Sequence, residues 1–287
     1  MRMVESATEC PFMRIGPEEP TSPVVLSVPH AGRAYSEALL KTSRLPREKL
    51  ETLEDRLMDR LIWRAVDAGI PAFIANVPRA EIDLNRDERE IDASMVAPAL
   101  PQRSVVQSAR TLGGLGLIPS RITGSGSIWL QRLPAAELSR RIQTVYRPYH
   151  EALEEALGGA LRRFGIAILL DCHSMPPREG EAGVVFGDRH GTSIAPELIR
   201  AAIEAAEACG YGTARNKPYA GGYITSRHGR PKNCIHALQI EIDRSLYLDE
   251  RLSDPGPGFD AAAQMIADVV KALSDKALEP PEAIAAE

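Results

Sequence analysis

The chain has 287 residues, of which 44% are hydrophobic and 25% are charged, and its formal net charge at pH 7 is -5. This composition is typical of a soluble globular protein, and so small a charge gives no electrostatic footprint for nucleic acid or anionic lipid. Neither nucleic-acid binding nor membrane association is therefore expected. Because no boundary in the sequence forces a division, we expect a single α/β domain over residues 1–287, with a globular core over about residues 20–275.

The four cysteines lie far apart, at positions 10, 172, 209 and 234, without a CxxC pair. This spacing argues against a disulfide scaffold and against a zinc site built from cysteines. The N-terminal segment lacks the apolar core of a signal peptide, and no stretch approaches the roughly 18 apolar residues that a membrane-spanning helix needs. We therefore expect a cytoplasmic protein.

Short apolar runs alternate along the chain with longer segments of helical period, which is the pattern of a layered α/β fold. The runs that we expect to form strands are residues 24–28, 72–77, 166–172, 183–187 and 236–242. They are rich in Val, Ile and Leu on both faces, as is typical of strands covered by helices on two sides. The sequence therefore predicts a central sheet between two helical layers.

The longest predicted helix covers residues 134–164, where apolar residues recur at three- and four-residue steps, and Pro148 is expected to kink or split it. Further helices are expected over residues 49–68, 193–209 and 259–274. A charged and proline-containing tail, residues 276–287, is expected to be disordered. The irregular stretches 86–133 and 213–235 are so long that we expect them to be functional or disordered.

Two histidines follow apolar runs that we expect to be buried strands: His30 in "SVPHAG" and His173 in "DCHSM". Ligands of open α/β sheets bind outside the carboxyl ends of the strands, so both histidines are expected at one edge of the sheet. A lone histidine more often has a structural role than a metal-binding one. Two histidines with acids nearby, however, are typical of zinc hydrolases, which commonly use two His and one carboxylate and leave a position for water.

The carboxylate of such a site is less clear from the sequence. Asp55 in "LEDRLMDRL" is expected at the start of a helix, with Glu54 beside it and Asp59 one turn further. As an alternative, these acids stabilise a helix N-terminus and pair with Arg56 and Arg60.

Other polar residues near strand ends also have two interpretations. Glu241 alternates with apolar neighbours, as on the polar face of a half-buried strand, but a carboxylate beside a metal can also act as a general base. Arg79, Asn85 and Arg86 follow another predicted strand. Guanidinium groups bind carboxylates or stabilise an oxyanion, whereas an ordinary surface arginine forms ion pairs.

The segment "PYAGGYITSRHG", residues 218–229, is either a glycine-rich surface turn or a substrate-binding loop. Its candidate substrate-binding residues are Gly222, Tyr223, Thr225 and His228. Cys172 is not expected to act as a nucleophile with His173, because adjacent strand residues point to opposite faces. We assign it to the core, and expect Asp171 to orient His173 or a neighbouring arginine.

Six segments in the same chain order, "SVPHAG", "EDRLMDRL", "RAEIDLNR", "DCHSM", "GGYITSRHG" and "LQIEIDRSLY", resemble the N-formylglutamate amidohydrolase family between about residues 24 and 250. The resemblance implies a zinc-exopeptidase-like, three-layer αβα fold with a mixed, mostly parallel central sheet. It also implies metal-assisted hydrolysis of an N-acyl amino acid. N-formyl-L-glutamate, which would give formate and glutamate, is the expected substrate.

The resemblance further implies one Zn²⁺ per chain on His30, Asp55 and His173. Related zinc carboxypeptidases and aspartoacylases supply the carboxylate ligand three residues after the first histidine, but this chain has Arg33 there. The choice between Asp55 and Glu54 therefore stays open.

By the same resemblance, Glu241 is the expected general base and Arg79 an oxyanion-stabilising or substrate-binding residue. Asn85 and Arg86 resemble the Asn-Arg pair that holds a substrate carboxylate in those relatives. Two alternatives remain: a zinc deacylase or carboxypeptidase for another N-acyl amino acid or small peptide, and a small-molecule binding protein without activity. The sequence does not determine the oligomeric state.

Overall fold

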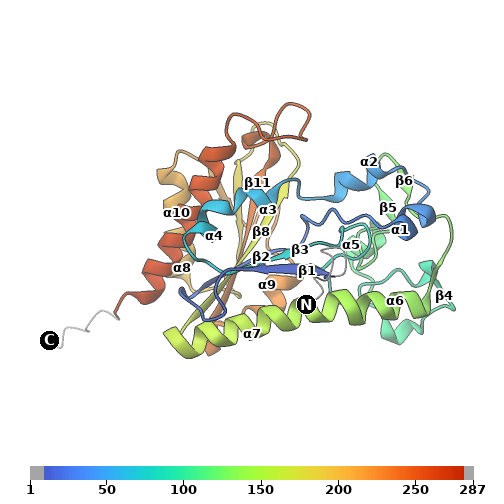
Figure 1. Ribbon diagram of the computed structural model, residues 1–287, viewed down its shortest axis with the longest axis horizontal. Coiled ribbons are helices and arrows are strands. Elements are labelled where there is room, and N and C mark those ends of the chain that lie inside the picture. The colour runs from blue at the N-terminus through green and yellow to red at the C-terminus, as the bar shows by residue number, and fades with distance from the viewer. Residues whose placement is uncertain (1–9, 281–287) are drawn as a thin grey trace, which may run out of the picture.

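The computed structural model describes residues 10–280, which form a seven-stranded mixed sheet in the order β1-β3-β2-β8-β11-β9-β10 (Figure 1). Its strands are β1 (Phe12–Ile15), β2 (Val24–Val28), β3 (Ala72–Ala75), β8 (Ala167–Met175), β9 (Val184–Gly187), β10 (Thr213–Arg215) and β11 (Ile235–Asp243). Strands β3, β2, β8 and β11 are parallel, whereas β1 is antiparallel to β3 and β9 is antiparallel to β11. The predicted α/β class with a mixed, mostly parallel sheet is confirmed.

The two central strands are longer than the sequence pattern predicts. Strand β8 does not end at residue 172 but continues through Met175, because its polar carboxyl end still pairs with β11. His173 therefore lies within the strand and not after it. The short edge strands β1 and β10 were not predicted, since neither has a recognisable apolar run.

Helices cover both faces of the sheet (Figure 1). Leu26, Leu170 and Ile240 belong to a core shared with α3 (Met58–Leu61), α4 (Trp63–Asp67), α8 (Pro196–Ala208) and α10 (Phe259–Leu278). On the opposite face Phe73 and Leu169 belong to a second core, shared with α6 (Ala135–Arg141) and α7 (Arg147–Phe164). Alternate strand residues thus enter two different cores, which explains why the strands are apolar on both faces.

The predicted helix over residues 134–164 is present, with a π-helical turn (Ile142–Tyr146) between α6 and α7. Pro148 lies in the first turn of α7, directly after this change in helical geometry. An irregularity at this place agrees with the prediction, because proline cannot donate the backbone hydrogen bond that a regular helix needs.

The prediction of one helix over residues 49–68 is wrong. The segment consists of α2 (Arg47–Leu50), a 3₁₀ turn (Glu51–Leu53), an irregular break, and then α3 and α4. Within the break Leu57 has a φ of 58°, and the backbone N–H of Asp55 donates to the carbonyl of His30 at 2.9 Å. A hydrogen bond to a distant part of the chain therefore replaces the helical one at Asp55.

The long irregular stretches contain short elements. The first stretch contains α5 (Ala109–Leu112) and the short strands β4 (Val96–Ala97), β5 (Arg121–Ile122) and β6 (Gly126–Ser127), and at its end begins β7 (Leu133–Pro134). Helix α1 (Glu37–Thr42) lies earlier in the chain. The glycine-containing segment forms α9 (Tyr223–His228).

Helix α10 extends to Leu278, so the prediction of disorder is wrong for residues 276–278, while residues 281–287 lie outside the described residues. Between residues 10 and 280, no helix has the length and apolar composition that crossing a bilayer requires.

Candidate active site

The carboxyl ends of β2, β8 and β11 border a cavity of about 320 Å³. This is the position at which open α/β sheets bind their ligands. Seven of the residues singled out in the sequence line the cavity: His30, Asp55, Arg79, Asn85, Arg86, His173 and Glu241.

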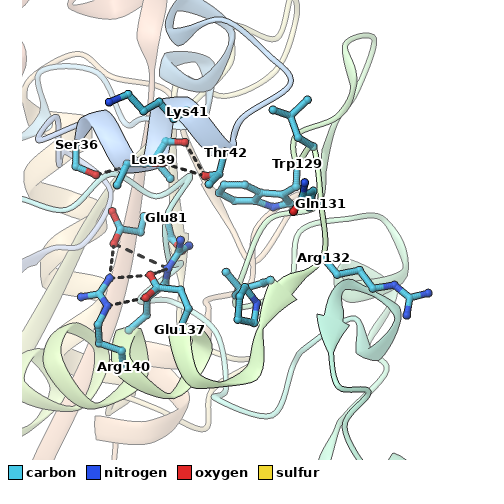
Figure 2. Close-up of a pocket in the computed structure, with 15 residues that line it drawn as sticks. Ser36, Leu39, Lys41, Thr42, Glu81, Trp129, Gln131, Arg132, Glu137 and Arg140 are labelled. Carbon is cyan, nitrogen blue, oxygen red and sulfur yellow. Dashed lines mark hydrogen bonds and ion pairs between the residues drawn. The ribbon is translucent and has the colours of Figure 1, made fainter.

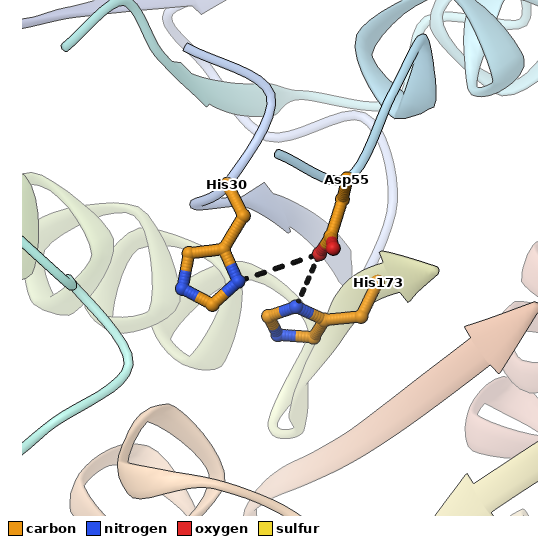
Figure 3. A group of neighbouring side chains, drawn as sticks. All are labelled: His30, Asp55 and His173. Atoms are coloured by element: carbon orange, nitrogen blue, oxygen red, sulfur yellow. Dashed lines mark hydrogen bonds and ion pairs between the residues drawn. The ribbon is translucent and has the colours of Figure 1, made fainter. Parts of the chain in front are cut away.

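His30, Asp55 and His173 point toward one another in this cavity (Figure 3). One potential ligand atom from each lies within 4.8 Å of the others. The Oδ2 atom of Asp55 is 2.8 Å from His173 Nδ1 and 3.3 Å from His30 Nδ1. The three residues are only 2–3% exposed, so they form a compact, buried group of metal-ligand type.

The geometry distinguishes Asp55 from its neighbour Glu54. The carboxylate of Glu54 accepts hydrogen bonds from the Tyr35 hydroxyl at 2.7 Å and from Arg56 Nη1 at 3.1 Å, and therefore does not face the histidines. Burial alone would raise the pKa of Asp55. The hydrogen bond of His173 and the charges of the two histidines outweigh that effect and hold this pKa well below its usual range, so the side chain stays ionised.

Each histidine is oriented by a second buried carboxylate. His30 Nε2 lies 2.8 Å from Asp83 Oδ1, and His173 Nε2 lies 2.8 Å from Asp171 Oδ2. The expected contact between Asp171 and His173 is thus present. Burial would lower the pKa of His173, but the charges and hydrogen bonds of Asp171 and Asp55 outweigh it and hold this pKa well above its usual range, so without a metal both ring nitrogens donate. A bound metal would take the place of the Nδ1 proton and leave Nε2–H donating to the second carboxylate.

The donor set fits a metal ion. His30 Nδ1 is buried and has no hydrogen-bond partner among the described residues. A buried nitrogen without a partner is costly, and a metal ion at the centre of the group would satisfy it. Two imidazole nitrogens and one carboxylate are the ligands of many catalytic zinc sites.

Glu241 is brought beside the histidines by the register of the sheet, which places it opposite His173 and places Gln239 opposite Asp171. Gln239 Nε2 donates to Glu241 Oε1 at 2.9 Å. Burial raises the pKa of Glu241 to about 7, because the charge of the nearby Asp55 adds to the effect of burial and the positive groups only partly offset it. Such a carboxylate can exchange protons near neutral pH.

Asp83 connects the arginines of the site to His30. Its Oδ2 atom accepts from Arg79 Nε at 2.9 Å and lies 3.5 Å from Arg86 Nη2. Arg86 also donates to the backbone carbonyls of Asn85 and Leu115, both at 2.7 Å. Asp83 was not singled out from the sequence, although it stands in "RAEIDLNR" between Arg79 and the Asn-Arg pair.

Gly222 lies behind the cavity wall. Its N–H donates to Gln239 Oε1 at 2.8 Å, and an added Cβ would come within 2.3 Å of the Asn85 side-chain amide. The residue at this position must therefore be small because the Asn85 side chain packs against it.

Tyr223, Thr225 and His228 do not line the cavity. They belong to α9, where the Thr225 hydroxyl donates to the Gly222 carbonyl and His228 Nε2 lies 3.0 Å from His150 Nδ1. Burial lowers the pKa of both histidines, that of His228 to about 3, so both stay neutral at pH 7. Thr225 and His228 are buried and Tyr223 is partly buried, so none of the three extends into the cavity, and their substrate contacts stay a prediction.

The cavity also contains residues that the sequence analysis did not single out: Arg110, Tyr219, Gln239 and Arg244. Arg244 donates to Ser174 Oγ at 3.1 Å, and its Nη2 lies 3.3 Å from Asp55 Oδ1. No local pattern distinguishes Arg110 or Arg244 from a surface arginine. Only the position of Arg244 directly after β11 could have indicated a role.

A larger cavity of about 580 Å³ lies away from this site, between α1, α6 and the segment around Trp129 (Figure 2). No histidine is among the described residues that line it. Its two acids, Glu81 and Glu137, both pair with Arg140, at 3.6 and 2.7 Å. It therefore lacks the combination of histidines and a carboxylate that the first cavity has.

Comparison with known proteins agrees with this geometry. The N-formylglutamate amidohydrolase family model matches residues 22–248. The chain is 30% identical over 237 residues to the N-formylglutamate deformylase of Pseudomonas putida, covering 79% of this chain and 82% of that protein. It is 28% identical over 240 residues to the N-formylglutamate deformylase of Pseudomonas aeruginosa, covering 80% of this chain and 83% of that one.

The crystal structure of the N-formylglutamate amidohydrolase from Ralstonia eutropha JMP134 superposes with a TM-score of 0.84 at 33% sequence identity, covering 93% of this chain and 97% of that one. The family model thus covers residues 22–248, and the similarity in fold extends over 93% of the chain. The protein therefore belongs to the N-formylglutamate amidohydrolase family and is a hydrolase that acts on amide bonds.

Proposed function

We propose that this protein hydrolyses N-formyl-L-glutamate to formate and glutamate, using a zinc ion held by His30, Asp55 and His173. The main support for a metal ion is the buried group in which two Nδ1 atoms face one carboxylate. Among the described residues, His30 Nδ1 has no hydrogen-bond partner. The substrate is the one named for the relatives in Pseudomonas and Ralstonia.

When bound, zinc would supply a Lewis acid for the formyl carbonyl and lower the pKa of the attacking water towards ~7. Glu241 takes the proton from that water, since its own pKa of about 7 allows it to be ionised at neutral pH. The same carboxyl group then delivers the proton to the amine nitrogen that leaves. The position of Glu241 opposite His173 supports this role.

Arg79 and the Asn-Arg pair bind the charges of the substrate. Arg79 uses its Nε to hold Asp83, and its Nη groups stabilise the oxyanion that develops on the formyl oxygen. The Oδ1 atom of Asn85 accepts from the Ile224 N–H at 2.8 Å, which fixes Nδ2 on the side of His173. Asn85 and Arg86 together hold the α-carboxylate of the substrate.

The first experiment measures zinc content and formate release in parallel. We expect about one zinc per chain in the purified protein, lost in His30→Ala and in His173→Ala, together with loss of formate release from N-formyl-L-glutamate. His190→Ala, which changes an exposed histidine outside the cavity, should leave both unchanged. Protein without bound zinc that added zinc does not activate would contradict the metal role. Zinc-loaded protein that releases no formate would contradict the substrate.

We further propose a cytoplasmic location. The four cysteines are free, and three of them, Cys10, Cys209 and Cys234, are exposed. Exposed free thiols are typical of proteins in a reducing compartment. Fractionation of the native cells followed by immunoblotting would test this, and recovery with exported proteins would contradict it.

A further inference from the structure

Arg110 adds a positive charge to the cavity that the reaction described above does not use. It lies in α5 and lines the same cavity as Asn85 and Glu241. The other three cavity arginines are close to carboxylates: Arg79 and Arg86 to that of Asp83, and Arg244 to that of Asp55. Arg110, in contrast, forms no ion pair with any residue between 10 and 280.

The surroundings of Arg110 favour an anion. Its charge acts on two other residues that line the cavity, Arg86 and Tyr219. The pKa of Arg86 is lowered to about 10, mainly by burial, and the neighbouring charges of Arg79 and Arg110 add to this effect. Guanidinium groups in the same cavity repel each other, and an anion bound between them would offset that repulsion.

The backbone of Arg110 is coupled to Arg86. The Arg110 carbonyl accepts from the Leu115 N–H at 2.8 Å, and the Leu115 carbonyl accepts from Arg86 Nε at 2.7 Å. At the start of the helix, Ser108 Oγ accepts from the Thr111 N–H at 3.1 Å. These bonds hold the turn that carries Arg110 against the part of the site where Arg86 lies.

The proposed substrate has two carboxylates, and only one of them is accounted for by Asn85 and Arg86. For the second, on the glutamate side chain, Arg110 is the cavity arginine without a carboxylate beside it among the described residues. We infer that Arg110 binds the side-chain carboxylate of an N-formyl dicarboxylic amino acid and thereby sets the preference for an acidic side chain. This inference rests on the proposed function.

The test compares N-formyl-L-glutamate with N-formyl-L-glutamine, which has nearly the same size but an uncharged side chain. In Arg110→Gln, kcat/KM for the glutamate substrate should fall about 10- to 100-fold, as expected for loss of a charge-assisted hydrogen bond. The fall should be mainly in KM, because the contact is remote from the scissile bond. Activity on the glutamine substrate should change by less than about threefold, so the preference for glutamate largely disappears.

Arg103→Gln is the matched control, since it removes the same charge from an exposed residue of the same irregular stretch that does not line the cavity. It should leave the preference unchanged, and Arg110→Lys should retain part of it. Equal losses on both substrates, or no loss on glutamate, in a folded Arg110→Gln protein would overturn the inference. If the wild type releases formate from both substrates equally well, the inference fails while deformylation stands. If it releases formate from neither, the proposed function fails as well.

Discussion

Glu241 shows how a residue suited to proton transfer lowers the stability of the folded chain. Burial raises its pKa from the usual 4.5 to about 7, so ionising it is harder in the folded protein than in the unfolded one. A group whose folded-state pKa is raised favours folding most at low pH and loses that contribution as the pH rises to its folded pKa. Ionised Glu241 therefore destabilises the metal-free protein at pH 8.

We predict that Glu241→Gln stabilises the metal-free protein at pH 8 by on the order of 3 kcal/mol while reducing turnover of the zinc-loaded enzyme at least about 100-fold. The gain should be absent below about pH 4.5, grow up to about pH 7 and remain constant above it. Urea unfolding at several pH values measures it. Glu155→Gln, at an exposed position, should show neither effect. Near-normal turnover in Glu241→Gln would remove this residue from the role of general base.

Asp83 is expected to affect zinc binding through its contact with His30. Its carboxylate accepts from His30 Nε2 and from Arg79 Nε, and thereby holds the imidazole with Nδ1 toward the site centre. Asp83→Asn should lower zinc affinity about 10- to 100-fold, the usual effect of losing a carboxylate that orients a metal-binding histidine. Competition with a chromogenic chelator measures this affinity. The control is Asp87→Asn, since Asp87 pairs with Arg89 in the same segment and does not line the cavity, and equal affinities of the two variants would exclude the orienting role.

At the scale of elements, the segment that carries Arg79, Asp83 and Asn85 is held in place from α6. Arg141 donates to the backbone carbonyl of Glu81 and to Glu137 Oε1, both at 2.8 Å. Its guanidinium also lies 5.5 Å from the centroid of the Trp129 ring. A helix on one face of the sheet therefore stabilises the irregular segment that supplies the site.

Arg140 and Arg141 allow this role to be measured, because both pair with Glu137 but their side chains are 52% and 5% exposed. Arg141→Met should lower the free energy of unfolding by about 2–4 kcal/mol, since it leaves the Glu81 carbonyl without its donor. Arg140→Met should lower it by less than about 1 kcal/mol, as for an exposed ion pair (Figure 2). Chemical denaturation of both variants gives the comparison. Equal losses of unfolding free energy in the two variants would mean that the buried contact of Arg141 stabilises the protein no more than the exposed ion pair of Arg140.

At the scale of the whole molecule, the proposed zinc site joins three parts of the chain that are distant in sequence. His30 follows β2, Asp55 lies in the break before α3, and His173 lies in β8. A ligand that binds only the folded state stabilises it, by about 2.7 kcal/mol at a concentration 100 times its Kd.

Zinc should therefore raise the melting temperature of chelator-treated protein, and the rise should be absent in His173→Ala. Differential scanning calorimetry gives the measurement. Mg²⁺ at the same concentration serves as the control, because it prefers oxygen ligands and should leave the melting temperature unchanged. An equal shift in His173→Ala would show that zinc binds elsewhere.

The central strands β2, β8 and β11 could be predicted because runs of Val, Ile and Leu are a local property of the sequence. The positions of His30, His173 and Glu241 at the carboxyl ends of these strands followed from the same runs. The helix expected over residues 49–68 was wrong, since its apolar period continues through a break that a tertiary hydrogen bond stabilises. Helix α9 was not predicted, because the glycines before it indicated a loop.

The sequence by itself determined the α/β class, the strands of the sheet centre and the residue types of the proposed metal site, because these depend on local period and on motifs in order. Only the tertiary structure decided that Asp55 and not Glu54 faces the histidines, that Asp83 orients His30, and which cavity arginine has no carboxylate beside it in the described part of the chain. Those outcomes depend on contacts between residues far apart in the chain, such as the bond from the Asp55 N–H to the His30 carbonyl. No local pattern encodes such contacts.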